Sequence, residues 1–441
     1  MPAGSEAEHI RRKTTSSDPN RLRGICRHED FHLAFDSGSP AGSYIATPYA
    51  EEDSPLALVI AGSFVGSVKA FCGEELSAGA TYADVFVAGL DGQHRCRWAR
   101  AFGSAGSDQV LDTIIGRDGG PLLLAALDDE ARLDGVELPG PSCMLLKFDH
   151  KGVLDWNVRL PGCAVGAGDQ PLVRPALPDA LAVDEAGNFY VAQGLQDAAT
   201  IGATVLPKPL AQALLVLKVS AAGAPTWAAV FGPESAPSRL YPHTISVAPD
   251  GHVYVLGHAD GTFALPGGGT RPGPAWFVAA LDPAGSTRWI QLYPDGSAPI
   301  ADLAAHAGGV YALLASASSG PMQIAVQSLS LEGREVWRSE LGDGVVSPLE
   351  IEVDRSGRAF VAGDAAEPAT IGDESATGST QIFLVSLEPD GRVAWSHVYG
   401  PQAPPPDAWL GLADLAVGPN DLLYVVTAGR ELEPSVAAFQ R

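Results

Sequence analysis

The sequence predicts an all-β protein made of repeated, four-stranded antiparallel sheets, and three observations predict this class. Apolar residues make up 46% of the chain and recur in short runs rather than along a helical stripe. The 50 glycines and 35 prolines supply many tight turns. One tryptophan-centred motif returns along the chain with fixed internal spacing. Charged residues are only 18% of the chain, which is too few for a disordered or coiled-coil protein.

The repeated motif reads as a β-hairpin with a tryptophan in its second strand. Clear copies are FVAGLDGQHRCRWARAFG (86–103), FVAALDPAGSTRWIQLYP (277–294) and FLVSLEPDGRVAWSHVYG (383–400). In every copy the first strand ends eight positions before the tryptophan, and a large apolar residue follows four positions after it. Turn sequences such as DPAG and EPDG are typical of hairpins. The six tryptophans in this position are Trp98, Trp156, Trp227, Trp289, Trp337 and Trp395.

A second hairpin lies between successive copies, as in LAVDEAGNFYVAQG (181–194) and ISVAPDGHVYVLGH (245–258). Each repeat therefore holds four strands, which we name A, B, C and D. The tryptophans are 48 residues apart at the closest (Trp289 to Trp337) and 71 at the widest (Trp156 to Trp227). Four short strands in a repeat of this length predict a blade of a β-propeller, whose ring closure reduces exposed sheet edges.

The two ends of the chain predict how the ring closes. The last segments, 412–418, 422–428 and 435–441, read as strands A, B and C, and no D strand follows them. Near the N-terminus, the segment 30–38 resembles 98–106 when Phe31 is aligned with Trp98 and Phe35 with Phe102. We therefore expect an N-terminal strand to complete the last blade. Counting gives seven blades, with six or eight left open because the first copy is the weakest. The predicted domains are a polar tail, 1–27, and one propeller, 28–441.

Together with GSAGSDQV (103–110), the repeated motif resembles the bacterial β-propeller repeats known as SBBP repeats, over nearly all of residues 30–441. The resemblance implies the fold and leaves the function open, since that family has no common catalytic residues. It also implies frequent export. The hairpin around the tryptophan is similar to the PQQ-binding and BamB-like propeller repeat as well, although the longer B–C connections here depart from that pattern.

The charge of the chain narrows the choice of partners. A net charge of −24 disfavours nucleic acid and anionic lipid surfaces. No run of 18 apolar residues exists, which argues against membrane insertion by a helix. The N-terminal segment lacks the apolar region of a signal peptide, so we expect a cytoplasmic protein, with an exported form as the alternative. We expect the tail to be disordered alone and to become ordered on a partner.

The five cysteines show no spacing typical of a zinc site, and we expect no metal or cofactor. Their odd number argues against a complete disulfide framework. Two pairs could meet within a single blade, and free, half-buried thiols are the alternative. These pairs are Cys72 with Cys96 and Cys143 with Cys163.

The face that carries the B–C and D–A connections is the predicted binding face. These connections are long, whereas the A–B and C–D turns on the other face are short, and long loops on a rigid scaffold are where binding sites usually lie. Trp276, Trp409 and Tyr241 are expected near this long-loop face. They could stack on a sugar ring or anchor a partner protein, and the alternative is that they cap the blade cores.

His243 and His258 are expected to approach each other on the same face. His252 should lie at the opposite end of the strand, roughly 20 Å away, so the sequence predicts no shared metal site. Asp108 and Asp169 lie in similar D–A loops, where a carboxylate could bind a cation or transfer protons; the alternative is an Asx-turn within the loop.

Three B–C connections share a short pattern, in 131–140, 199–207 and 369–375. We interpret it as a small extra strand pair rather than a site.

No local catalytic motif is present: the chain has no GxSxG, phosphate-binding glycine loop, HExxH or DxDxDG. We therefore name no catalytic residue and favour a non-enzymatic scaffold that binds another protein through the long-loop face. The alternatives are a small-molecule or glycan binder at the channel mouth and a propeller enzyme, either a hydrolase or lyase or a quinone-dependent oxidoreductase.

Overall fold

A computed structural model gives the fold of most of the chain. It describes residues 26–32, 43–46, 56–69, 75–77, 82–93, 95–161, 180–201, 204–235, 238–294, 300–316, 321–377, 381–399, 409–418, 423–430 and 435–440. Within these ranges every regular element is a β-strand, and no helix is long and apolar enough to cross a membrane.

The strands group into four-stranded antiparallel units, numbered here in chain order. Unit 1 contains β2 (Ser43–Ala46), β3 (Leu58–Phe64), β6 (Asp84–Leu90) and β7 (Cys96–Phe102). Unit 2 contains β8 (Gln109–Ile115), β9 (Pro121–Leu127), β12 (Ser142–Phe148) and β13 (Leu154–Leu160). Unit 3 contains β14 (Leu181–Val183), β15 (Phe189–Leu195), β18 (Ala213–Val219) and β19 (Pro225–Pro233).

The remaining units follow the same order. Unit 4 contains β20 (Leu240–Val247), β21 (Val253–Ala259), β24 (Ala275–Leu281) and β25 (Thr287–Pro294). Unit 5 contains β26 (Ile300–His306), β27 (Gly309–Ser316), β28 (Met322–Ser330) and the first part of β29 (Glu335–Val353). Unit 6 contains the rest of β29, β30 (Ala359–Ile371), β32 (Gln381–Leu387) and β33 (Val393–Tyr399). Unit 7 contains β34 (Trp409–Val417), β35 (Leu423–Arg430), β36 (Ser435–Gln440) and β1 (Cys26–His32).

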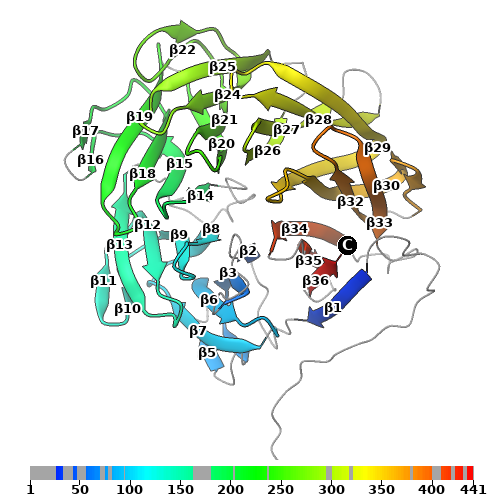
Figure 1. The fold of residues 1–441 in the computed structure, drawn as a ribbon. Helices are drawn as coiled ribbons and strands as arrows, with labels where there is room; N and C mark the ends of the chain where they lie inside the picture. The colour runs from blue at the N-terminus through cyan, green and yellow to red at the C-terminus, as the bar shows by residue number, and fades with distance from the viewer. Residues whose placement is uncertain are drawn as a thin grey trace, which may run out of the picture.

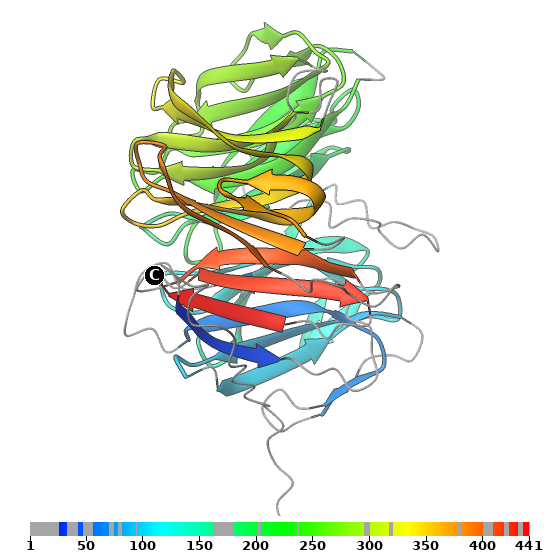
Figure 2. The ribbon, with the colours of Figure 1, turned by 90° about the vertical axis from the view of Figure 1, so that its right-hand side faces the viewer.

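The units follow one another around a common centre, with the first strand of each nearest the middle (Figure 1). Neighbouring inner strands contact one another along the chain, and β34 of unit 7 also contacts β2 of unit 1. The N-terminal strand β1 pairs with β36, with Phe31 opposite Val436, and Figure 2 shows the two side by side. The prediction that an N-terminal strand completes the last sheet is thus confirmed, although β1 begins at Cys26, before the expected boundary. The predicted register is wrong: Glu29, opposite Ala438, holds the place that Trp98 holds opposite Gly89, and Phe31 lies two residues further along. The architecture is all-β and propeller-like.

Two connections depart from the expected pattern of separate four-stranded sheets. β29 is 19 residues long and passes without a loop from the outer edge of unit 5 to the inner edge of unit 6, so these units form one continuous sheet. The connection between them is too short for a loop, and Gly344, at a φ of +119°, lets the chain remain extended beside Ala369. In addition, the hairpin of β22 (Phe263–Ala264) and β23 (Thr270–Arg271), which follows β21 of unit 4, pairs with β19 of unit 3.

The tryptophan spacing of the repeat arises from contacts between units. The indole N–H of Trp227 donates to the carbonyl of Pro283 in the C–D turn of the next unit, at 3.1 Å. The ring also packs on Gly285 of that turn, which has a φ of +86°. The same donation recurs from Trp98 to His150, Trp156 to Ala221, Trp289 to Leu331 and Trp337 to Pro389. Each of these five tryptophans therefore joins its own unit to the turn of its neighbour.

Acidic residues on the inner strands form a second repeated contact, which sequence reasoning missed. Asp302 of β26 is fully buried and accepts hydrogen bonds from the Thr244 hydroxyl of unit 4 (2.9 Å) and the Ile351 N–H of unit 6 (2.9 Å). The carboxylate of Asp112 in unit 2 likewise accepts a hydrogen bond from the N–H of Leu181 in unit 3, at 2.7 Å. The signal in the sequence was an acidic residue at the same place in strand A of units 2, 5, 6 and 7, where Asp112, Asp302, Glu350 and Asp414 lie.

The shared B–C pattern forms extra strand pairs, as predicted. They are β10 (Ala131–Leu133) with β11 (Val136–Leu138), β16 (Ala199–Ile201) with β17 (Thr204–Leu206), and the end of β30 with β31 (Glu374–Ser375). Unit 1 has a matching pair, β4 (Ser67–Lys69) with β5 (Glu75–Ser77).

Candidate functional site

Four of the seven residues predicted from the sequence meet at one end of unit 4. Tyr241 lies opposite His258, His258 opposite Trp276, and Trp276 opposite Tyr293, across β20, β21, β24 and β25. Because residues directly opposite in an antiparallel sheet share a face, the side chains of Tyr241, His258, Trp276 and Tyr293 form a row across the unit. The row, together with His243, is called the aromatic–histidine row below. It lies at the strand ends that carry the B–C and D–A connections, as expected.

His243 enters the row through a bulge in β20. The register shifts between Pro242 and Thr244, so His243 has no opposite residue, and its ring lies 4.4 Å from the Trp276 ring between centroids. His258 contacts Trp276 at 5.1 Å and Tyr241 at 6.3 Å. His243 and His258 were predicted to approach each other. In the structure both imidazole rings contact the ring of Trp276.

The protonation state of His243 follows from its surroundings. Burial, and next the charge of nearby His258, lower the pKa of His243 to about 4. At neutral pH its imidazole is therefore uncharged, with one nitrogen able to donate and the other able to accept. Within the described part of the chain, no hydrogen bond to this ring is formed. A polar, uncharged ligand group could complete it.

The matching positions of units 1, 2, 3 and 6 lack this combination. The B, C and D strands carry Ser63, Val85 and Phe102 in unit 1, Ala126, Cys143 and Leu160 in unit 2, Gly194, Leu214 and Phe231 in unit 3, and Asp364, Ile382 and Tyr399 in unit 6. None of these sets holds a histidine or a tryptophan. A local departure from the pattern of a repeat is where a functional residue is expected.

Part of the row also supports the fold. Trp276 and Tyr293 pack against a cluster of buried residues between units 4 and 5 that includes Leu256 and Leu314, which agrees with the alternative that Trp276 caps a core. The Tyr293 hydroxyl donates to Gln327 at 2.6 Å. Burial, and next the nearby Glu335 carboxylate, raise the pKa of Tyr293 far above its usual value, so this phenol remains protonated. The sequence had placed Tyr293 only as a repeat position.

The remaining predicted residues lie elsewhere. Asp108 is fully buried and accepts hydrogen bonds from the Ser104 hydroxyl (2.8 Å) and the Asp128 N–H (2.9 Å), which ties the D–A connection in place. Burial raises the pKa of Asp108 despite these bonds. Trp409 opens β34 as expected, but its side chain, and all of Asp169, lie outside the described residues.

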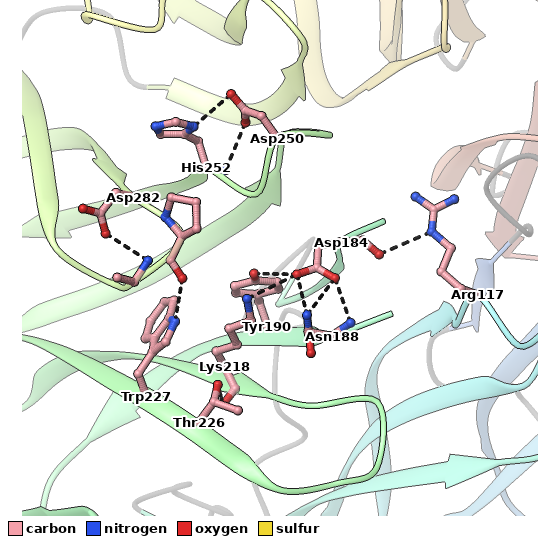
Figure 3. A network of polar contacts seen from close by, with 12 residues as sticks. Arg117, Asp184, Asn188, Tyr190, Lys218, Thr226, Trp227, Asp250, His252 and Asp282 are labelled. Atoms are coloured by element: carbon pink, nitrogen blue, oxygen red, sulfur yellow. Dashed lines mark hydrogen bonds and ion pairs between the residues drawn. The ribbon is translucent and has the colours of Figure 1, made fainter. Parts of the chain in front are cut away.

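A separate polar network lies on the short-turn face of units 3 and 4 (Figure 3). Asp184 accepts from the Asn188 amide, from the Tyr190 hydroxyl at 2.8 Å, and lies 3.3 Å from the Lys218 ammonium group. Although burial opposes it, these bonds lower the pKa of Asp184. The partners of its carboxylate all come from unit 3, while the Arg117 side chain of unit 2 donates to its backbone carbonyl at 3.3 Å. We assign this network to the stability of the A–B turn. Across the described ranges, no three His, Cys, Asp or Glu side chains gather as a metal site would require.

Comparison with known proteins adds neither a family nor a function to the propeller-like architecture described above. No family model and no curated protein matches the chain. Among solved structures it is similar to a member of the DUF4221 family from Bacteroides vulgatus, with 10% identity over 95% of this chain and 98% of that one and a TM-score of 0.40. It is also similar to the WD40 domain of SCAP from fission yeast (10% identity, 92% and 96% covered, TM-score 0.35) and to the Synechocystis apocarotenoid oxygenase (10%, 90% and 88%, 0.42). Similarities of this size carry no functional argument.

Proposed function

We propose that the chain is a closed, seven-bladed propeller that acts as a non-enzymatic scaffold and binds another protein through its long-loop face. The contact between β34 and β2 and the pairing of β1 with β36 support closure. Each four-stranded unit is then one blade, and the continuous sheet of units 5 and 6 is two blades joined by β29.

Exposed apolar side chains on the B–C connections are the observation that carries the scaffold proposal. Val205 and Leu210 of unit 3 are 73% and 67% exposed, and Val136 of unit 2 is 40% exposed. The hairpins β10–β11 and β16–β17 lie on the outer rim of neighbouring units, so the proposed contact surface includes this rim beside the long-loop face (Figure 1). Apolar side chains that fill no core of their own are typical of a protein contact. We name Val136, Val205 and Leu210 the rim residues.

The experiment compares rim substitutions with a matched one elsewhere. The tagged protein would be captured from its own cells as wild type, as Val205→Asp/Leu210→Asp, and as Val336→Asp. Val336 is 63% exposed on β29 near a C–D turn, on the short-turn side. We expect a stoichiometric partner that the rim variant loses at least tenfold and the control retains. Equal retention by both variants, with unchanged melting temperatures, would contradict the proposal.

The aromatic–histidine row favours a second candidate function, a small-molecule or glycan binder. Tyr and Trp rings offer stacking surfaces, and the uncharged His243 offers a donor and an acceptor, which together suit a neutral hydroxylated ring. The charge of −24 disfavours anionic ligands. We expect glycans to change the tryptophan fluorescence of the wild type and the His252→Ala control but not of Tyr241→Ala/His243→Ala. A glycan panel without any response would remove this candidate.

A further inference from the structure

The outer strand of unit 3 leads to an inference that does not rest on the proposed function. The D strand is the outermost strand of its unit, so one of its edges presents main-chain N–H and C=O groups to the surroundings. Proteins usually protect such edges with charged side chains, which keep them from pairing with another chain. The D strand of unit 3 is β19, with the sequence PTWAAVFGP, and it contains no ionisable residue.

The sequences of the other outer strands all contain ionisable residues. These are Arg97 and Arg100 in β7, Asp155 and Arg159 in β13, Arg288 in β25, Arg338 and Glu340 in β29, His397 in β33, and Glu29 and Asp30 in β1. In β33 the main-chain N–H of Val398 also donates to the carboxylate of Glu374, at 3.0 Å, so that one donor of the strand is already bound. Two copies of the chain that paired along such a strand would bring like charges together, which disfavours the pairing.

The outer edge of β19 already accepts a strand from a neighbouring unit. Strand β22 of unit 4 pairs antiparallel with it at Gly232 and Pro233. Across the described ranges, no strand pairs with the outer edge of residues 225–231. The hairpin β16–β17 does not fill this edge, because it forms a separate two-stranded sheet and packs through Leu206 in the cluster that Val230 contacts. The edge is therefore open to a further strand that would continue the line of β22.

A second copy of β19 fits this free stretch, because an antiparallel strand pair can be self-complementary. A twofold axis between two copies lets the same patch contact itself. Residues directly opposite share a face of the sheet, so the axis passes through one residue rather than between two. The centre of residues 225–231 is Ala228. The resulting pairs are Ala228 with its own copy, Trp227 with Ala229, and Thr226 with Val230.

The side chains in these pairs suit a close approach of the two edges. The alanines at and beside the axis are small, so the two main chains can reach hydrogen-bonding distance. Thr226 and Val230 are both β-branched, as is favourable across a sheet.

The net charge of the chain favours β19 over the other outer strands as the place of contact. Each copy carries a charge of −24, so two copies repel one another, and an uncharged edge adds nothing to this repulsion. Salt screens charges that lie more than roughly 8 Å apart at physiological ionic strength. Association through β19 should therefore become stronger as salt is added, whereas a contact made of ion pairs becomes weaker.

We propose that two copies of this chain associate through β19, edge to edge and antiparallel, about a twofold axis at Ala228. The sheets of the two copies of unit 3 then form one continuous sheet across the dimer. A pairing of this length buries less than the roughly 1,200 Å² of a stable protein interface, so the dimer is reversible, with a dissociation constant in roughly the micromolar range.

Sedimentation equilibrium of the purified full-length protein over a range of concentrations tests this proposal. We expect a dimer whose dissociation constant falls as NaCl is raised from about 50 mM to about 500 mM. Ala228→Glu and Ala228→Lys should each be monomeric, because like charges meet at the axis. An equimolar mixture of the two variants should form dimers again, because glutamate then lies opposite lysine. Asp155→Lys, which changes the charge of the outer strand β13, is the control and should dimerise like the wild type.

A wild type that stays monomeric at every concentration would overturn the proposal, as would a dimer that both Ala228 variants retain. A mixture that stays monomeric, although both variants keep the melting temperature of the wild type, would show that Ala228 is not at the axis. Because these variants leave Val136, Val205 and Leu210 unchanged, a failure here does not affect the proposed binding of another protein.

A cross-linking variant tests the register without adding a charge. Opposite residues of an antiparallel pair have Cα atoms about 4.5–5.5 Å apart, which is within the range of a disulfide. Oxidised glutathione should therefore convert Ala228→Cys into a covalent dimer on a non-reducing gel, and leave Asp155→Cys, with the same native cysteines, as a monomer. Equal cross-linking of the two variants would overturn the assigned register.

Discussion

The imidazole of His243 lies against the indole of Trp276, with 4.4 Å between ring centroids, in a place where burial lowers its pKa to about 4. His306, stacked on Tyr311 in unit 5, has a pKa lowered to about 4 by burial as well. Both rings are uncharged in the folded protein at neutral pH.

We expect stability to fall as the solution is acidified from about pH 6.5 to pH 4. In this window the unfolded chain, whose histidines titrate near 6.5, binds protons that the folded protein does not, so protonation favours unfolding. Urea unfolding at several pH values measures the slope. The double variant His243→Gln/His306→Gln should lose most of it, and an unchanged slope would contradict the assignment.

The tryptophan contacts between units predict a difference between two similar substitutions. Trp227→Phe removes the indole donor to Pro283 and should lower the free energy of unfolding by about 1 kcal/mol beyond the loss of packing. The Trp395 indole N–H has no acceptor in the described part of the chain, so Trp395→Phe should cost less. Chemical denaturation of both variants tests this order, and equal losses would speak against the hydrogen bond.

The turn glycines beneath the tryptophans predict a second ordered pair. Gly285 and Gly251 have φ values of +86° and +84°, so alanine is strained at both. A Cβ at Gly285 would lie 2.8 Å from Trp227 ring atoms, whereas at Gly251 the nearest atom is Pro283 Cγ at 3.4 Å. Gly285→Ala should therefore destabilise the fold by roughly 1 kcal/mol more than Gly251→Ala. Matching denaturation midpoints would contradict this prediction.

Asp302 predicts the largest effect on stability. Its carboxylate joins units 4, 5 and 6 through Thr244, Leu303 and Ile351, and Asp302→Ala would leave these buried donors without an acceptor. We expect a loss of about 3 kcal/mol or more in the free energy of unfolding. Asp282→Ala, which removes an acceptor from an exposed turn, serves as the control and should cost about 1 kcal/mol. A loss for Asp302→Ala no larger than the control's would remove the proposed role.

Much of the fold could be predicted because its signals are local. The turns after Leu281 and Leu387, and the alternation of apolar residues around them, indicate hairpins without knowledge of distant residues. The continuation of β29 from unit 5 into unit 6 was not predicted, since it depends on what the extended chain can pair with across the sheet.

The candidate site was predicted in part for the same reason. Tyr241, His258 and Trp276 could be placed near the long-loop face from their positions in strands. The inclusion of Tyr293 depends on the register of β24 and β25, and the uncharged state of His243 depends on burial between units. Neither can be read from a single segment.

The sequence by itself determined the strands and the turns, because hairpins form between neighbouring segments of the chain. The match of an N-terminal segment to the repeat indicated that the two ends share a sheet, although these segments lie far apart in the chain. Only the tertiary structure decided which side chains meet between units, such as Trp227 with Pro283, Asp302 with Ile351 and His243 with Trp276. The physical reason is that these contacts join segments up to several tens of residues apart, and their geometry is set by how whole sheets pack.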